Sequence, residues 1–146
     1  MTPFVCAGAG FLLAVLWFDL MFDVQIASRG AGEEAVASIA AYYRRVTTAA
    51  RPMNRLVAAA MVATFGSIVV QIARGERPRW VGWVALSLAG AAIALAGVRT
   101  VPHAVRLGAR SDPAGDRREL AKSIYRDHLA CFVAISAVLA VELGFA

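Results

Sequence analysis

Four long apolar segments, separated by short polar connections, set the pattern of this chain. They cover residues of about 3–25, 53–73, 80–101 and 123–143. Each one supplies the roughly 20 mainly apolar residues that a helix needs to cross the hydrocarbon core of a bilayer. Membrane-spanning strands would instead give short segments of alternating polarity. The pattern therefore predicts an all-α integral membrane protein, one domain over residues 1–146, folded as an antiparallel four-helix bundle.

The composition supports the same class of protein. Hydrophobic residues make up 60% of the chain, charged residues only 17%, and the mean hydropathy is +0.64. A soluble domain of this length needs more polar residues to cover its surface. The first apolar segment has no Lys or Arg before it and no small-residue cleavage site after it, so we expect a retained span and not a signal peptide.

The connection over residues 28–52 contains a further helical pattern. In the stretch EEAVASIAAYYRRVTTAA, the residues Val36, Ile39, Ala40 and Tyr43 fall on one face of a helix. We therefore expect an extra amphipathic helix between the first two spans. It either lies on the membrane or continues into the second span.

The basic residues are distributed unevenly over the connections. Five precede the second span, three lie between the second and third, and seven lie between the third and fourth. Basic connections stay in the cytoplasm, so we expect connections 28–52 and 102–122 to be cytoplasmic, with both termini outside the plasma (inner) membrane. The net charge of +5 then reports topology and contact with membrane lipid, and no motif that reads bases suggests nucleic acid. The basic residues are Arg29, Arg44, Arg45, Arg51 and Arg55, then Arg74, Arg77 and Arg79, then Arg99, Arg106, Arg110, Arg117, Arg118, Lys122 and Arg126.

Small residues recur at a spacing of four in every span. Such stripes allow helices to approach closely in lipid, where packing drives association. We interpret them as packing inside the bundle, and a homo-oligomer formed through them is left open. The positions are Gly10 and Ala14, then Ala59, Ala63 and Ser67, then Gly90 and Ala94, and finally Ser136, Ala140 and Gly144.

Two acids, Asp19 and Asp23, interrupt the apolar pattern near the end of the first span. Being four residues apart, they share one face of that helix. Asp19 lies roughly 22 Å from the start of the helix, which is still within the hydrocarbon. An acid at this depth is costly and should face the bundle interior, where a partner is available.

At the opposite end of the bundle, Gln71 and Glu142 are the polar residues, and we expect Glu142 to be solvated.

The predicted topology brings the cytoplasmic ends of the other spans to the same depth as these acids. We name Asp19, Asp23 and His128 as candidate catalytic residues, with His128 or His103 as proton carrier and an Asp orienting its ring. The candidate substrate-binding residues are Tyr43, Asn54, Arg55, Arg99, His103 and Arg126.

Three interpretations of this polar cluster stay open. In the first interpretation, the cluster is a structural ion-pair network in which the acids neutralise Arg55, Arg99 or Arg126, as in a non-catalytic membrane subunit or assembly partner. Alternatively, it is the polar end of a pocket that binds, and transforms, an amphipathic small molecule or lipid. The third interpretation is a metal site built from the two acids with His103 and His128. The sequence assigns no metal and no cofactor.

Two stretches of the last third of the chain carry a family resemblance. The stretch VPHAVRLG after the third span, followed by SIYRDHLACFVAI at the start of the fourth, resembles the small four-helix membrane proteins grouped with anthrone oxygenase. Val101-Pro102, Arg126 and His128 carry the likeness. It implies oxidation of a polycyclic phenol, with His128 as the base. The whole chain also resembles small bacterial membrane proteins that imply no activity.

Overall fold

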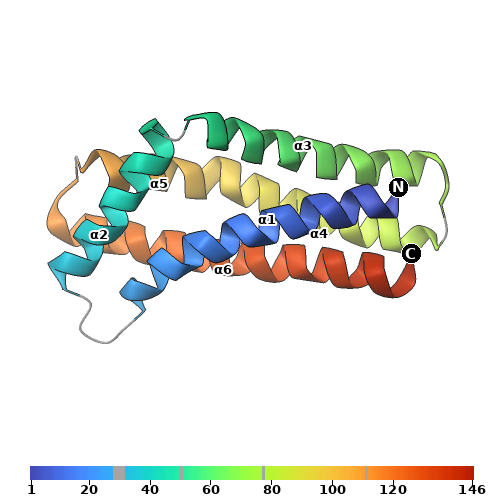
Figure 1. Ribbon diagram of the computed structural model, residues 1–146. Helices are drawn as coiled ribbons and strands as arrows, with labels where there is room; N and C mark the ends of the chain where they lie inside the picture. Colours follow the sequence, from blue (N-terminus) through green and yellow to red (C-terminus); the bar gives the residue numbers. More distant parts are fainter. Residues whose placement is uncertain (28–31, 50, 77, 111) are drawn as a thin grey trace.

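The computed structural model describes residues 1–27, 32–49, 51–76, 78–110 and 112–146, which form helices and no strand (Figure 1). Arg29 and Arg77, two of the basic residues counted above, lie outside this part of the chain, and so does the side chain of Arg51. The elements are α1 (Thr2–Asp23), the 3-10 turn η1 (Val24–Ile26), α2 (Glu33–Arg44), the π-helical turn η2 (Arg45–Ala49), α3 (Arg51–Ala73), α4 (Arg79–Leu95), the π-helical turn η3 (Ala96–Thr100), α5 (Val101–Ala109) and α6 (Ala114–Phe145).

Four helical stretches are long and apolar enough to cross a membrane: Thr2–Ile26, Pro52–Ala73, Arg79–Ala109 and Ala114–Phe145. They match the four predicted spans, which suggests a multi-pass membrane protein. The last two are longer than expected, because charged residues end an apolar run in the sequence without ending the helix. At 1.5 Å per residue, α6 is roughly 48 Å long, well beyond the roughly 30 Å of a hydrocarbon core.

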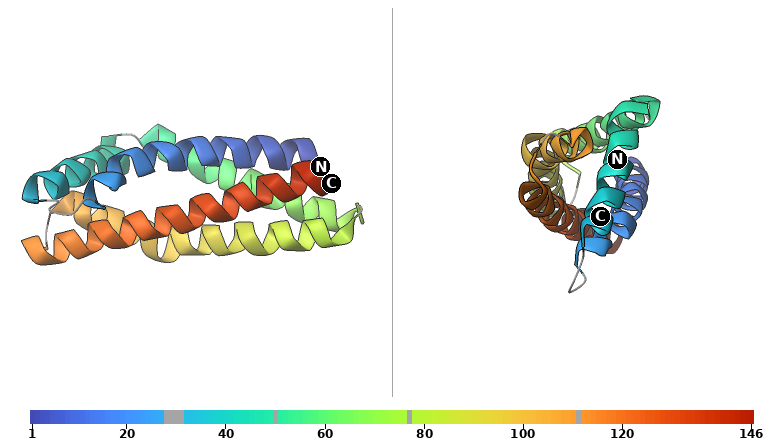
Figure 2. Two further views of the ribbon diagram at one scale, coloured as in Figure 1. Left: turned by 90° about the horizontal axis from the view of Figure 1, so that it is seen from below. Right: turned by 90° about the vertical axis from the view of Figure 1, so that its left-hand side faces the viewer.

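The four long helices lie side by side around a common interior, and both termini are at the same end (Figures 1 and 2). Helix α1 contacts α3 and α6, and α4 also contacts both of them. Buried apolar side chains of small and medium size pack together between these helices. This cluster comprises Val5, Ala9, Leu12, Ile68, Ala85, Ala89, Ala92, Cys131, Ile135 and Val138.

Two glycines outside the predicted stripes allow the closest helix contacts. A Cβ atom on Gly8 of α1 would lie 1.9 Å from Oγ1 of Thr64 on α3. A Cβ on Gly82 of α4 would lie 2.7 Å from Ile72. The stripe residues, by contrast, turn largely outward, because a spacing of four defines a helix face but not the direction in which it points. Ala14, Ala59, Ala63, Ala94 and Ala140 are all exposed.

Helix α2 crosses the end of the bundle opposite the termini (Figure 1). Its four buried residues are the ones that the sequence placed on one face: Val36, Ile39, Ala40 and Tyr43. That face packs against α5 and α6, and Gly108 of α5 sits so close that a Cβ there would lie 2.9 Å from the backbone N of Arg44. The apolar face is therefore covered by protein. This second cluster also contains Ile26, Ala104, Leu107, Leu120, Ala121 and Ile124.

Candidate functional site

Asp23 is the centre of a hydrogen-bonded cluster beneath α2. Its side chain is 0% exposed. The Tyr43 hydroxyl donates to Asp23 Oδ1 at 2.7 Å, and His128 Nδ1 of α6 lies 2.7 Å from Asp23 Oδ2. The Tyr43 hydroxyl also lies 3.3 Å from His128 Nδ1. Three separate elements thus meet at one carboxylate, and both of its oxygens have partners.

The second acid, Asp19, is partly buried one turn earlier on the same face of α1. The Tyr42 hydroxyl donates to Asp19 Oδ1 at 2.6 Å. The Tyr42 ring stacks on Phe22, with the ring centroids 4.1 Å apart and an interplanar angle of 9°. Asp19 Oδ2 lies 3.9 Å from His128 Nε2, which is too far for a hydrogen bond. One oxygen of Asp19 is therefore fixed, and the other faces the histidine across a gap.

The two tyrosines stay neutral in this setting. Burial raises the pKa of Tyr43 far above its ordinary value, and the Asp23 and Asp19 carboxylates raise it further. Burial raises the pKa of Tyr42 too, and Asp19 adds to the effect. A neutral phenol is a hydrogen-bond donor, so each tyrosine holds its proton for the carboxylate it faces.

The hydrogen bonds assign the proton on the His128 ring. A carboxylate only accepts hydrogen bonds, so Nδ1 must donate to Asp23. In the neutral ring, Nε2 is then an acceptor, and no other described residue donates a hydrogen bond to it. This is the arrangement of a histidine oriented by a carboxylate, in which the far nitrogen can take up a proton from another molecule.

A pocket with a volume of about 440 Å³ lies between the long helices and ends at this cluster. This volume falls in the range of roughly 300–1,000 Å³ that is typical of small-molecule sites. Its polar end is formed by Asp19, Tyr42, Tyr43, Thr47, Asn54, Thr100 and His128. The remaining wall is apolar: Leu12, Val15, Leu16, Val46, Met53, Val57, Ala58, Met61, Ala92, Ile93, Ala96, Val101, Ala104, Cys131 and Ile135.

Both π-helical turns border this pocket. Val46 and Thr47 of η2 line it from one side, and Ala96 and Thr100 of η3 from the other. In η3, the Thr100 hydroxyl donates to the carbonyl of Leu95, five residues earlier, at 3.3 Å. Single π-helical turns inside α-helices occur frequently at functional sites. The backbone conformation and the polar side chains therefore both indicate this pocket as the candidate site.

The predicted arginines lie away from the pocket. Arg55, Arg99 and Arg126 are all exposed, and none of them lines it. Arg99 instead lies 3.2 Å from Asp127 Oδ2, an ion-pair distance without hydrogen-bond geometry, and it donates to Ser123 Oγ at 3.0 Å. The partners that the structure gives Asp19 and Asp23 are tyrosines and a histidine, because long arginine side chains extend outward to the polar surface. A part for these arginines in binding stays a prediction without geometric support.

Of the other predicted residues, Asn54 lines the pocket and His103 does not. The Asn54 side chain donates to the carbonyl of Val46 at 2.6 Å and so fastens α3 to η2. His103 is partly buried, with no hydrogen-bond partner for Nδ1 among the described residues. Within the same residues no group of three or more His, Cys, Asp or Glu side chains is arranged to hold a metal ion. The metal interpretation, which needed His103 beside the two acids, therefore lacks its ligand set.

At the opposite end of the bundle, the expectation that Glu142 is solvated is wrong. Glu142 is 1% exposed and accepts a hydrogen bond from Gln71 Nε2 at 3.3 Å. Its Oε1 has no hydrogen-bond partner among the described residues. Nearby, the N-terminal ammonium of Met1 lies 2.8 Å from Glu76 Oε2. The position of Glu142 near a helix end suggested contact with water, but Gln71 on α3 covers it.

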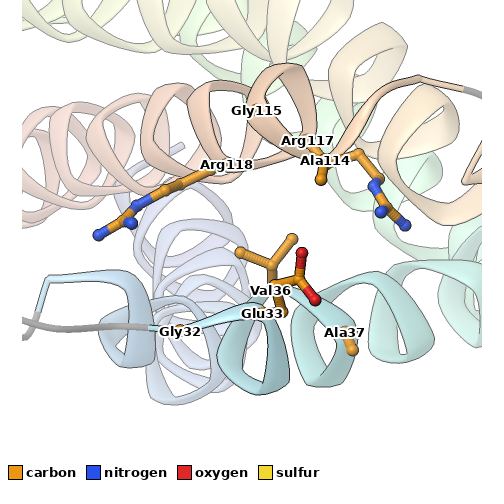
Figure 3. Close-up of a pocket in the computed structure, with 8 residues that line it drawn as sticks. All are labelled: Gly32, Glu33, Val36, Ala37, Ala114, Gly115, Arg117 and Arg118. Atoms are coloured by element: carbon orange, nitrogen blue, oxygen red, sulfur yellow. The ribbon is translucent and has the colours of Figure 1, made fainter.

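A second cavity, of about 400 Å³, lies between the start of α2 and the start of α6 (Figure 3). Glu33 reaches into it from α2, while Arg117 and Arg118 extend from α6 to either side. Gly32, Val36, Ala37, Ala114 and Gly115 complete its lining. Acid and base both border this space, so its charge favours no particular ligand.

Three members of the polar end, Tyr42, Thr47 and Thr100, were not among the predicted site residues. Tyr42 binds Asp19 as Tyr43 binds Asp23. The signal for Tyr42 was its place beside Tyr43, which was predicted: Tyr42 follows Asp19 by 23 residues and Tyr43 follows Asp23 by 20.

No family model, no curated protein and no solved structure matches this chain.

Proposed function

We propose that the chain is an antiparallel four-span membrane bundle that binds an amphipathic small molecule in the pocket ending at Asp19 and His128. In this proposal α2, α5 and the start of α6 form a cap on the cytoplasmic side. The excess of basic residues in the first and third connections supports that orientation. The apolar wall holds the body of the ligand, and the polar cluster holds its head group.

A single observation carries the proposal: a pocket of ligand size reaches a histidine whose ring is held by a buried carboxylate. Nε2 of His128 accepts a proton from the bound molecule, and Asp23 stabilises the charged imidazole that results. The residues that carry the resemblance to the anthrone-oxygenase-like proteins include Val101 and His128, and both line this pocket.

The alternative function is structural, and a different observation favours it. Both oxygens of Asp23 are occupied within the chain, and they tie α2 to α1 and α6. On this alternative the cluster only closes the end of the bundle, as in a non-catalytic membrane subunit. Asp19 separates the two functions, because it lines the pocket and its Oδ2 has no hydrogen bond from the described residues.

The test is Asp19→Asn, with Asp127→Asn as the matched control. Asparagine keeps an oxygen for the Tyr42 hydroxyl, and Asp127 is a buried carboxylate that does not line the pocket. Native mass spectrometry of gently solubilised protein would report the copurifying ligand. We expect Asp19→Asn to fold and to lose roughly 90% of that ligand, as the loss of a charged hydrogen-bond partner predicts, while Asp127→Asn keeps it. Folded Asp19→Asn protein with unchanged ligand content would favour the structural alternative.

A further inference from the structure

The pocket is open on one side, and the exposed residues of its lining show where. Among the described lining residues only Met53, Ala58 and Val101 are exposed. Met53 and Ala58 belong to α3, and Val101 is the first residue of α5. In the described part of the chain, no Cα atom of α3 lies within 8 Å of a Cα atom of η3 or α5. The mouth of the pocket therefore lies between the first half of α3 and the η3–α5 segment.

This mouth is apolar and lies at the level of the candidate membrane spans. Met53 is 53% exposed and Val101 is 54% exposed, and both lie inside stretches that are long and apolar enough to cross a membrane. Ala58 is roughly 9 Å along α3 from Pro52. Other exposed apolar side chains on the same two segments include Leu56 and Val62 on α3 and Val105 on α5. An opening with such a rim faces acyl chains, because water would find no polar partner there.

The polar end of the pocket restricts the charge of the head group. No Arg or Lys lines the pocket in the part of the chain that the structure describes. An anionic head would meet Asp19 without a compensating base, at a depth where unpaired charge is costly. With the His128 ring neutral, the groups left open by the described residues are His128 Nε2 and Asp19 Oδ2, which both accept hydrogen bonds. The head group must therefore donate, and a hydroxyl donates without carrying charge through the apolar mouth.

From these observations we infer that the pocket takes up an uncharged, membrane-dissolved molecule with a hydroxyl head, which enters sideways from the bilayer between α3 and η3–α5. The inference rests on the proposed function, and it adds the route and the chemical class of the ligand. The hydroxyl donates to His128 Nε2 or Asp19 Oδ2, and the tail extends through the mouth into the lipid.

Photoaffinity labelling tests both parts. The protein is placed in phosphatidylcholine nanodiscs and exposed to a long-chain alcohol carrying a diazirine, or to the matched fatty acid or the matched alkylamine. Labelled peptides are then counted by mass spectrometry. We expect the alcohol to label the pocket-lining peptides roughly tenfold more than either charged probe. Labelling that is equal or stronger with the acid or the amine would overturn the assignment of the head group.

The route is tested by filling the mouth. Ala58→Trp places a large ring at the rim, and Ala59→Trp places the same ring on the neighbouring exposed position, which does not line the pocket. We expect Ala58→Trp to lower labelling by the alcohol roughly tenfold and Ala59→Trp to leave it unchanged. If Ala58→Trp does not fold, Val101→Trp against Val98→Trp makes the same comparison. Unchanged labelling in a folded mouth variant would overturn access from the bilayer.

The two proposals fail in different ways. If the wild-type protein copurifies with a ligand that Asp19→Asn loses, but Ala58→Trp has no effect, the proposed function stands and the sideways route is wrong. If no probe labels the wild-type pocket above the level of Asp19→Asn and no ligand copurifies, both the route and the proposed function are wrong.

Discussion

The two ends of the bundle each bury a carboxylate, but they treat it differently. At the end covered by α2, both oxygens of Asp23 have partners, and a pocket opens beside the cluster. At the end near the termini, Glu142 accepts a hydrogen bond from Gln71 at Oε2, and the Thr2 side chain and the N-terminal ammonium are its other polar neighbours. A carboxylate whose two oxygens both have hydrogen-bond partners is held in place by those bonds. It can therefore border a cavity without close packing on every side.

The contacts of α3 with its neighbouring helices also differ between the two ends of the bundle. Near the termini, Gly8 lets α1 approach Thr64 of α3 without room for a single methyl group. Near α2, the start of α3 stays apart from α5, and the pocket occupies the space between. The comparison teaches that the end covered by α2 combines close packing of α2 on α5 with a hydrogen-bonded cluster beside a pocket, whereas α1 and α3 are in close contact at the other end. The predictions below test that division.

The largest effect is expected from Asp23→Ala. The change removes the acceptor for Tyr43 and for His128 and leaves both polar groups buried. Breaking a buried charged network in this way costs about 3–5 kcal/mol. Reversible unfolding in mixed micelles would measure it, with the exposed Asp116→Ala as control. A loss below about 1 kcal/mol, the range of a surface pair, would mean that Asp23 does not hold this end together.

A smaller effect is expected from Gly8→Ala at the opposite end. The new Cβ would collide with Thr64, whose hydroxyl donates to the carbonyl of Ala60 at 2.7 Å and so resists rotation. Overpacking of this kind costs about 1–3 kcal/mol. Gly10→Ala on the same helix meets nothing within 4 Å and is the matched control. Equal stability of the two variants in the same unfolding assay would contradict the close contact between α1 and α3.

An isosteric pair sharpens the contrast between the two carboxylates. Glu142→Gln keeps the shape and removes a charge that is only half satisfied, so the free energy of unfolding should change by less than about 1 kcal/mol or rise. Asp23→Asn breaks at least one of two good hydrogen bonds and should lower it more. If Glu142→Gln lowered the free energy of unfolding more than Asp23→Asn does, Asp23 would not be the better stabilised of the two carboxylates.

The smallest effect concerns pH and is absent near neutrality. The pKa of Tyr42 and of Tyr43 is raised by burial and by the adjacent carboxylates. Their stabilising contribution is complete below the ordinary tyrosine value of about 10. It is lost as the pH rises further, because only the unfolded chain releases these protons. The slope of stability against pH above 10 should be shallower in Tyr42→Phe/Tyr43→Phe than in the wild type. Parallel slopes would show that neither hydroxyl is shielded in the fold.

Much of the fold was predictable from the sequence, because long apolar runs and the face of α2 are local patterns. The four stretches that are long enough to cross a membrane and the buried residues Val36, Ile39, Ala40 and Tyr43 follow from them. The lengths of the last two helical stretches were not predictable in this way. Polar residues such as those around Asp116 end an apolar run, yet the backbone of α6 stays helical there.

The candidate site was predictable only in its acids and His128. Asp19 and Asp23 stand out because charge at membrane depth needs a partner, and the fourth helix brings His128 to that depth. Which partner wins depends on the reach and direction of side chains across the fold. The arginines extend outward, so Tyr42 and Tyr43 take the carboxylates instead. Glu142 is hydrogen-bonded to Gln71, which is 71 residues away in the sequence, so no local pattern predicts its burial.

The cluster around Asp23 is assembled from pieces that leave the ribosome at very different times. Tyr43 follows Asp23 by 20 residues, whereas His128 follows it by 105. During synthesis α1, with its two acids, is therefore complete long before α6 exists. The early hydroxyls of Tyr42 and Tyr43 can shelter those acids at once, and the histidine completes the arrangement at the end. The chain order thus makes the two tyrosines available to the acids of α1 before His128, and both tyrosine–carboxylate bonds persist in the completed fold.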